Sequence, residues 1–116
     1  MDQSVEGSAS VLKIDIDPGQ ELYTREHMRR LLERAGYKLV RLRKVRSPSG
    51  KGWHVYVELD RPVFNWHEMV ALQAILGSDR YREACNVQRV RTLANMEDPE
   101  MRAYWTPRFN VFYARR

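Results

Sequence analysis

The sequence predicts an α+β domain in which an antiparallel sheet is covered by helices on one face. Some short segments alternate apolar and polar residues, as strands do, whereas longer segments repeat apolar residues at helical spacing. In chain order these segments are β-α-β-β-α-α-β, the split βαβ or ferredoxin-like pattern. A chain of 116 residues suits one such domain. We expect it over residues 11–116, after a flexible leader over residues 1–10.

The first predicted unit is a strand followed by a helix. Residues 11–17 alternate and are rich in β-branched side chains, and Pro18 with the glycine after it ends the strand. Thr24 is a good N-cap for a helix over residues 25–35, and Gly36 supplies its C-terminal stop.

A hairpin follows. Residues 37–46 alternate, with Val40 and Leu42 on one side. Residues 53–60 alternate again, and the segment between them, residues 47–52, is rich in Ser and Gly. Two alternating runs joined by such a turn predict two antiparallel strands.

The second half predicts two helices and a last strand. Residues 65–76 carry apolar side chains at helical spacing. Ser78 is the expected cap of a second helix over residues 79–94, which the segment 95–99 interrupts. Residues 109–113 are the last strand candidate.

The amino-acid composition limits the classes of partner and the cellular setting that we expect. Lys and Arg number 20 against 15 Asp and Glu, giving a net charge of +5 and favouring a polyanionic partner. A solvated basic surface is the alternative. The one cysteine excludes an internal disulfide and a cysteine-rich zinc site, so we expect a reducing, cytoplasmic or intracellular viral setting. No apolar run is long enough to span a bilayer.

Polar side chains share one face of two predicted strands. Because side chains alternate along a strand, apolar and polar residues separate onto opposite faces of residues 11–17 and 53–60. The polar set is Lys13, Asp15, Asp17, His54, Tyr56 and Glu58. In the ferredoxin-like order these two strands are neighbours, so we expect the six side chains together on the open face of the sheet.

Asp15 and Asp17 form an Asp-x-Asp at the end of a strand. Two carboxylates on one side suit a hard divalent cation such as Mg²⁺ or Mn²⁺, which prefers carboxylate and phosphate oxygens. The alternative is structural: Asp17 starts a turn, and Asp15 pairs with Lys13 or with a basic residue of the next strand.

The turn over residues 47–52 offers groups that suit a phosphate. Gly50 and Gly52 permit a close backbone approach, Lys51 adds a cation, and His54 follows on the strand. A hairpin turn of this composition also needs no ligand, so this alternative stays open.

Together these stretches resemble the first two motifs of the archaeo-eukaryotic primase superfamily, the primase-polymerases. The Asp-Ile-Asp of residues 15–17 precedes Ser-Gly-Lys-Gly-Trp-His at residues 49–54. These two motifs are similar in sequence to those of the polymerase domain of bacterial DNA-repair ligases. The resemblance implies an RRM-like palm and metal-dependent nucleotidyl transfer in DNA replication or repair. It also implies a nucleoside triphosphate and a single-stranded or template-primer nucleic acid as partners.

The resemblance also implies roles for particular residues. Asp15 and Asp17 would bind the catalytic Mg²⁺ or Mn²⁺, and His54, with Ser49 and Lys51, would bind the triphosphate. Apart from the resemblance, strand parity places Tyr56 beside His54 on the open face, where we expect it to stack on a base or sugar.

The family has a third acid on a further strand. Glu58 has the right parity and is our candidate catalytic acid, although it lies on the strand of the histidine. Asp79 fits more simply as a first-turn residue of a helix, and Asn86 would be a neutralised acid.

Basic residues cluster on the strand over residues 37–46 and on the second predicted helix of the second half. Arg41, Arg43, Arg89 and Arg91 are the candidates for contacting a nucleic-acid backbone. The alternative is an edge strand that charge protects from aggregation.

Other functions remain open beside the polymerase reading. One is a non-catalytic ferredoxin-like nucleic-acid-binding module, such as an accessory replication factor of a virus or mobile element. An RRM-type RNA binder fits less well, because acids take the place of aromatic residues on the first strand. A structural or interaction protein of a virus or mobile element is the third.

Overall fold

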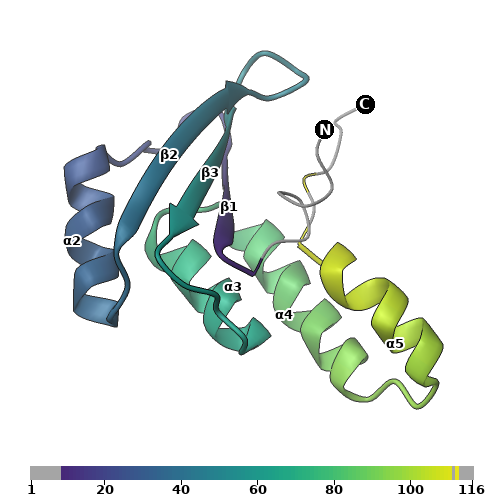
Figure 1. Cartoon of the computed structure of the whole chain (residues 1–116). Coiled ribbons are helices and arrows are strands. Elements are labelled where there is room, and N and C mark those ends of the chain that lie inside the picture. The colour runs from purple at the N-terminus through teal and green to yellow at the C-terminus, as the bar shows by residue number, and fades with distance from the viewer. Residues whose placement is uncertain (1–8, 111, 113–116) are drawn as a thin grey trace.

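The computed structural model of the chain describes residues 9–110 and residue 112 (Figure 1). The strands are β1 (Val11–Ile16), β2 (Leu39–Arg46) and β3 (Trp53–Leu59). The helices are α2 (Arg25–Ala35), α3 (Trp66–Ile75), α4 (Arg80–Ala94) and α5 (Pro99–Trp105), followed by the 3₁₀ helix η1 (Thr106–Arg108). No helix within the described part of the chain is long and apolar enough to cross a membrane.

The sheet confirms the predicted α+β class and the adjacency of the first and third strands. Its three strands are antiparallel in the order β1-β3-β2, so β3 is central and β1 and β2 lie at the edges. The β1–β3 register pairs Lys13 with Tyr56 and Asp15 with His54. The two stretches predicted to form one site are therefore neighbours.

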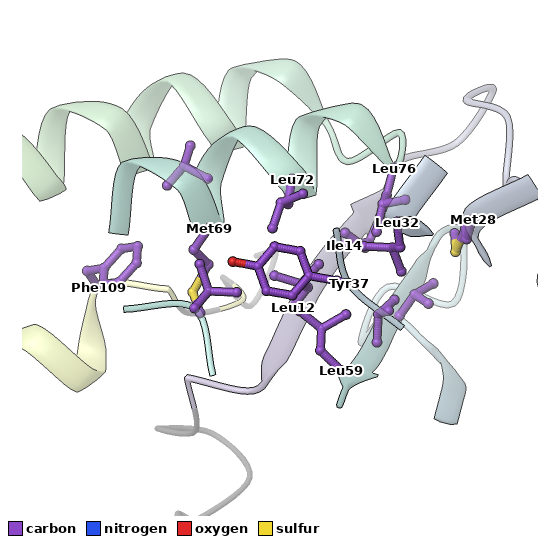
Figure 2. Packing of buried hydrophobic residues seen from close by; sticks show 14 of the residues in the cluster. Leu12, Ile14, Met28, Leu32, Tyr37, Leu59, Met69, Leu72, Leu76 and Phe109 are labelled. Atoms are coloured by element: carbon purple, nitrogen blue, oxygen red, sulfur yellow. The ribbon is translucent and has the colours of Figure 1, made fainter. Parts of the chain in front are cut away.

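The core lies between one face of the sheet and helices α2 and α3 (Figure 2). Leu12 and Ile14 of β1 are fully buried against Met69 and Leu72 of α3. Leu32 of α2 packs into the same cluster. The strand residues come from the apolar face of β1, and the helix residues from the apolar stripes of α2 and α3, as the sequence predicts.

Capping defines the ends of the helices. Thr24 accepts a hydrogen bond from the His27 N–H at the start of α2, and Gly36 ends this helix with a φ of 94°. The prediction of Ser78 as the cap of α4 is wrong. Asp79 is the N-cap, and its carboxylate accepts from the Arg82 N–H at 3.0 Å.

The C-terminal part differs most from the prediction. The segment from Pro99 forms the short helix α5, where the sequence indicated only an interruption. Phe109 and Asn110 form a bend and not a strand. Val111 and Tyr113 of the predicted last strand lie outside the described residues.

The outer edge of β1 has no neighbouring strand within the described part of the chain. Its backbone groups form hydrogen bonds with side chains and with the start of α4 instead. The Lys13 N–H donates to Gln73 Oε1 at 2.9 Å, and Arg82 Nη1 donates to the Lys13 carbonyl at 3.0 Å. Two positions along, the Asp15 N–H donates to Ser78 Oγ, and the Asp15 carbonyl accepts from the Asp79 N–H at 2.6 Å. Gln73 of α3, Arg82 of α4 and the segment between these helices thus satisfy both backbone groups of each outward-facing residue.

Candidate functional site

Asp15 and His54 face each other across the β1–β3 pair. Asp15 Oδ1 lies 3.7 Å from His54 Nε2, and the two side chains are 19% and 12% exposed. The contact follows from the register, because directly opposed residues of antiparallel strands hold their side chains on the same face. The acid and the histidine of the two predicted motifs therefore touch, at a place that water still reaches.

Asp17 lies just beyond the end of β1, in a turn. Its carbonyl accepts from the Gln20 N–H at 3.0 Å, and its own N–H donates to Gln20 Oε1 at 2.8 Å. Gln20 also donates from Nε2 to Asp79 Oδ1 at 2.9 Å. The turn role that the sequence left open for Asp17 is present, and Gln20 ties this turn to the start of α4.

The described acids do not form a complete protein site for a divalent cation. Within the described residues, no group of three or more His, Cys, Asp and Glu side chains is arranged to hold a metal ion. Asp79 does not complete such a group, because both its oxygens accept hydrogen bonds, from Gln20 and from the Arg82 N–H. Mg²⁺ commonly takes one or two protein carboxylates and completes its shell with phosphates and water. Two carboxylates, Asp15 and Asp17, would leave such an ion to take its remaining ligands from phosphate and water, because the described residues supply no third acid or histidine group for it.

The predicted open face is covered near this pair. Lys13 is 1% exposed and Tyr56 is 7% exposed, so the prediction that they face solvent is wrong. The Phe112 ring stacks on His54 at a centroid distance of 3.9 Å and meets Tyr56 edge-on at 5.5 Å. The Arg82 guanidinium lies 4.8 Å from the centre of the same Phe112 ring. Phe112 and Arg82 of α4 thus cover the part of the sheet face that the predicted order of strands and helices left exposed to solvent.

The turn between β2 and β3 uses its own amide groups. The Gly50 N–H donates to the Ser47 carbonyl, the Lys51 N–H to Ser49 Oγ and the Gly52 N–H to Ser47 Oγ. Because the Gly50 and Gly52 amides already donate within the turn, the close approach of this backbone to a phosphate that the sequence suggested is not supported. A phosphate here would meet the exposed Lys51 side chain.

Gly52 serves close packing of the backbone. A Cβ atom at this position would lie 2.3 Å from the Ile16 carbonyl oxygen, a distance that real side chains do not adopt. Gly52 thus lets the start of β3 approach the end of β1, next to Asp15. Gly50 is the residue of this turn with a positive φ, 73°.

Glu58 lies away from Asp15. It pairs with Val11, four residues before Asp15, which corresponds to about 13 Å along a strand. Its carboxylate accepts from Arg41 Nε at 2.9 Å in an exposed ion pair. The structure does not bring Glu58 to the other two acids.

Strand β2 carries an exposed row of cations, as predicted, and aromatic rings lie beside it. The Arg43 guanidinium lies 4.6 Å from the centre of the Tyr56 ring. The Arg46 guanidinium lies 4.0 Å from the centre of the Trp53 ring. A hollow of about 270 Å³ opens between Arg41 and Arg43, with Tyr56 in its lining.

Arg89 and Arg91 belong to a different surface. Both lie on α4, which Figure 1 shows well apart from β2. Arg89 Nη1 donates to Asn86 Oδ1 at 3.0 Å, and Arg91 is exposed. The four predicted arginines therefore divide between two parts of the molecule.

A buried polar network beside the outer edge of β1 was not predicted. Glu83 accepts from Arg82 at 2.5 Å, from Ser78 Oγ at 2.6 Å and from the amides of Gln73 and Asn86. Asn110 Oδ1 also accepts from Arg82, at 2.9 Å. A signal was available in the sequence: residues 82, 86, 90 and 93 form one helical stripe, whose first two members are polar.

Comparison with known proteins gives no relative. No protein-family model matches the chain, and no curated protein and no solved structure matches it.

Proposed function

We propose that this chain is a nucleotide- and nucleic-acid-binding domain of the primase-polymerase type. The observation that carries the proposal is the pairing of Asp15 with His54, with Oδ1 and Nε2 3.7 Å apart. These residues belong to the two motifs that resemble the primase-polymerases, and 39 positions separate them in the chain. Their contact supports a single nucleotide site built from both motifs.

Each polar group has a distinct task in this proposal. Asp15 and Asp17 supply oxygen ligands for Mg²⁺ or Mn²⁺, an ion that neutralises phosphate charge and stabilises charge developing in nucleotidyl transfer. His54 donates a hydrogen bond to a phosphate oxygen, and Asp15 orients its ring. Lys51, exposed in the β2–β3 turn, adds a mobile positive charge.

The nucleic-acid strand lies along β2 in the same proposal. Arg41 and Arg43 are exposed on this edge strand and line the hollow beside Tyr56. Arginines in a row neutralise successive phosphates, so binding is expected to weaken steeply with salt.

A specific observation favours a second candidate, a non-catalytic nucleic-acid-binding module of the same fold. Phe112 stacks on His54, and Tyr56 is 7% exposed, so a base has no exposed ring of Tyr56 to stack on. Such a module keeps the cations of β2 and has no use for a divalent ion at Asp15.

Calorimetry with a deoxynucleoside triphosphate and Mn²⁺ tests the proposal. The wild-type chain is expected to bind the Mn²⁺–nucleotide complex, and the variant Asp15→Asn/Asp17→Asn is expected to lose this binding. The matched control is Glu21→Gln/Glu97→Gln, which removes the same charge at two exposed positions. Equal affinities of the wild type and the aspartate variant would contradict the nucleotide site.

Oligonucleotide binding separates the two candidates. Fluorescence anisotropy with a labelled single strand is expected to show weaker binding by Arg41→Gln/Arg43→Gln under both. Primer extension with Mn²⁺ by the wild type, lost in Asp15→Asn/Asp17→Asn, supports the polymerase type. Salt-dependent binding without extension and without response to Mn²⁺ supports the module.

A further inference from the structure

A second hollow lies on the opposite end of the molecule from α2, between α4 and α5. It measures about 560 Å³, within the range of ordinary ligand pockets. Leu93 of α4 and Phe109 form a buried apolar floor. Trp105 of α5 forms a wall, and this residue is 45% exposed although it carries a large aromatic ring.

Positive charge surrounds this apolar floor. Arg89 of α4 and Arg108 of η1 are both in the lining. The Arg108 guanidinium lies 4.0 Å from the centre of the Tyr104 ring, which fixes it at the α5 side. Arg89, bonded to Asn86, stands on the α4 side.

The hollow continues along α4. A shallower depression of about 510 Å³ shares Gln88, Thr92 and Met96 with it and adds Arg91 and Asn95. None of the described residues that line either depression is acidic. The two form an elongated groove, which we call the α4–α5 groove, with cations along it and an aromatic wall at one end.

We infer that the α4–α5 groove binds a short stretch of single-stranded nucleic acid. A base stacks on the exposed face of Trp105 over the Leu93–Phe109 floor. The adjoining phosphates lie between Arg89 and Arg108 and continue toward Arg91. Stacking on an aromatic side chain with flanking cations is the way proteins hold single strands without reading their sequence.

The chemistry of the groove distinguishes this ligand from other anions. An acidic peptide without aromatic residues satisfies the arginines but has no planar ring for Trp105. Inorganic phosphate satisfies the arginines and leaves the apolar floor without a partner. The groove contains no residue of the Asp15–His54 site, so it acts without a divalent ion and stands or falls independently of that site.

The single cysteine of the chain provides the readout. Cys85 is exposed and lies in the lining of the groove, so a bound strand shields its thiol. The rate of its reaction with Ellman's reagent is measured at low salt, without divalent metal, with and without an oligothymidylate of about ten nucleotides. The quantity compared between variants is the ratio of the two rates.

We expect saturable protection of Cys85 in the full-length wild type. Trp105→Ala is expected to weaken the protecting affinity by about tenfold, the size of one base–aromatic stacking contact. Arg89→Gln/Arg108→Gln is expected to lose protection at the same oligonucleotide concentration. The matched control is Arg25→Gln/Arg34→Gln, which removes two exposed arginines of α2 and is expected to keep it.

Other outcomes overturn the inference. No protection, or equal protection by polyglutamate or by inorganic phosphate, shows that no base is bound. Protection that survives Trp105→Ala shows the same, once circular dichroism confirms folding. If that variant does not fold, Trp105→Leu replaces it, an apolar side chain without a stacking face. Asp15→Asn/Asp17→Asn is expected to keep protection, which separates failure of the groove from failure of the nucleotide site.

Discussion

Arg82 of α4 donates from Nη1 to the main-chain carbonyl of Lys13 in β1, at 3.0 Å. The same guanidinium forms an ion pair with Glu83, and the two side chains are 3% and 4% exposed. An unpaired strand edge invites association with other chains. Here the buried Arg82, paired with Glu83, bonds to the outer edge of β1 and holds α4 against the sheet.

We predict that Glu83→Gln destabilises the domain by about 3–5 kcal/mol, the cost of leaving one partner of a buried ion pair without its counter-charge. Both Glu83 oxygens accept hydrogen bonds from neighbouring donors, and an amide nitrogen in one position turns an acceptor into a donor. Urea unfolding measures the free energy. The control Glu97→Gln changes an exposed side chain and is expected to shift it by less than about 0.5 kcal/mol. A shift for Glu83→Gln as small as that of the control would contradict the structural role of the pair.

The sequence predicted the elements well where local signals agree. The α2 bounds, its Thr24 cap and its Gly36 stop are confirmed, because a side-chain cap and a left-handed glycine act within a few residues. Arg82 is the opposite case. Its helical stripe with Asn86, Val90 and Leu93 was a signal, but its partners Lys13 and Asn110 lie 69 and 28 residues away in the chain, so the sequence did not show what buries it.

We predict that Gly52→Ala costs more than Gly50→Ala. The added methyl group at position 52 meets the Ile16 carbonyl at 2.3 Å, and backbone shifts of this kind cost about 1–3 kcal/mol or more. At position 50 the methyl group meets open space, and the cost is that of the left-handed backbone, about 1–2 kcal/mol. Thermal unfolding of the two variants gives the order. A Gly50 variant less stable than the Gly52 variant would contradict the close approach of β1 and β3.

The pH dependence of stability is predicted to involve Tyr37. Burial raises the pKa of its phenol from 10.0, as does its hydrogen bond to Glu68 Oε1 at 2.9 Å. The folded state therefore favours the protonated phenol. Its contribution is complete below the unfolded pKa and is lost as pH rises from there through the folded pKa.

Tyr37→Phe tests this assignment. The variant is expected to lose about 0.5–1.5 kcal/mol at neutral pH with the hydrogen bond, and to lose less stability than the wild type above about pH 10. The control is Tyr81→Phe, whose ring is 78% exposed. Unfolding in urea across the alkaline range gives both values. Parallel alkaline slopes for the wild type and Tyr37→Phe would refute the assignment.

The position of Phe112 leads to a prediction about ligand access to the candidate site. Because its ring stacks on His54 at 3.9 Å, a ligand of His54 competes with that contact. Aromatic contacts contribute about 0.5–1.5 kcal/mol, so Phe112→Ala is expected to raise nucleotide affinity by up to about tenfold. Calorimetry with the Mn²⁺–nucleotide complex measures the change. A loss of affinity would mean that Phe112 belongs to the binding site and does not cover it.

The sequence predicted which residues of the candidate site are neighbours, but not which residues cover them. Strand parity and element order brought Asp15 beside His54, because both act through the backbone. The same parity placed Tyr56 in solvent, where Phe112 and Arg43 now pack against its ring. Parity tells which face a side chain takes, and it says nothing about what distant segment covers that face.

The most direct test of the proposed nucleotide site follows the three histidines by NMR. His27 and His67 are exposed on α2 and α3 and serve as internal controls for His54. Substoichiometric Mn²⁺ added with a deoxynucleoside triphosphate is expected to broaden the His54 ring signals first, and this selectivity is expected to vanish in Asp15→Asn/Asp17→Asn. Equal broadening of all three histidines, or selective broadening that persists in the aspartate variant, would contradict a metal–nucleotide site at Asp15 and His54.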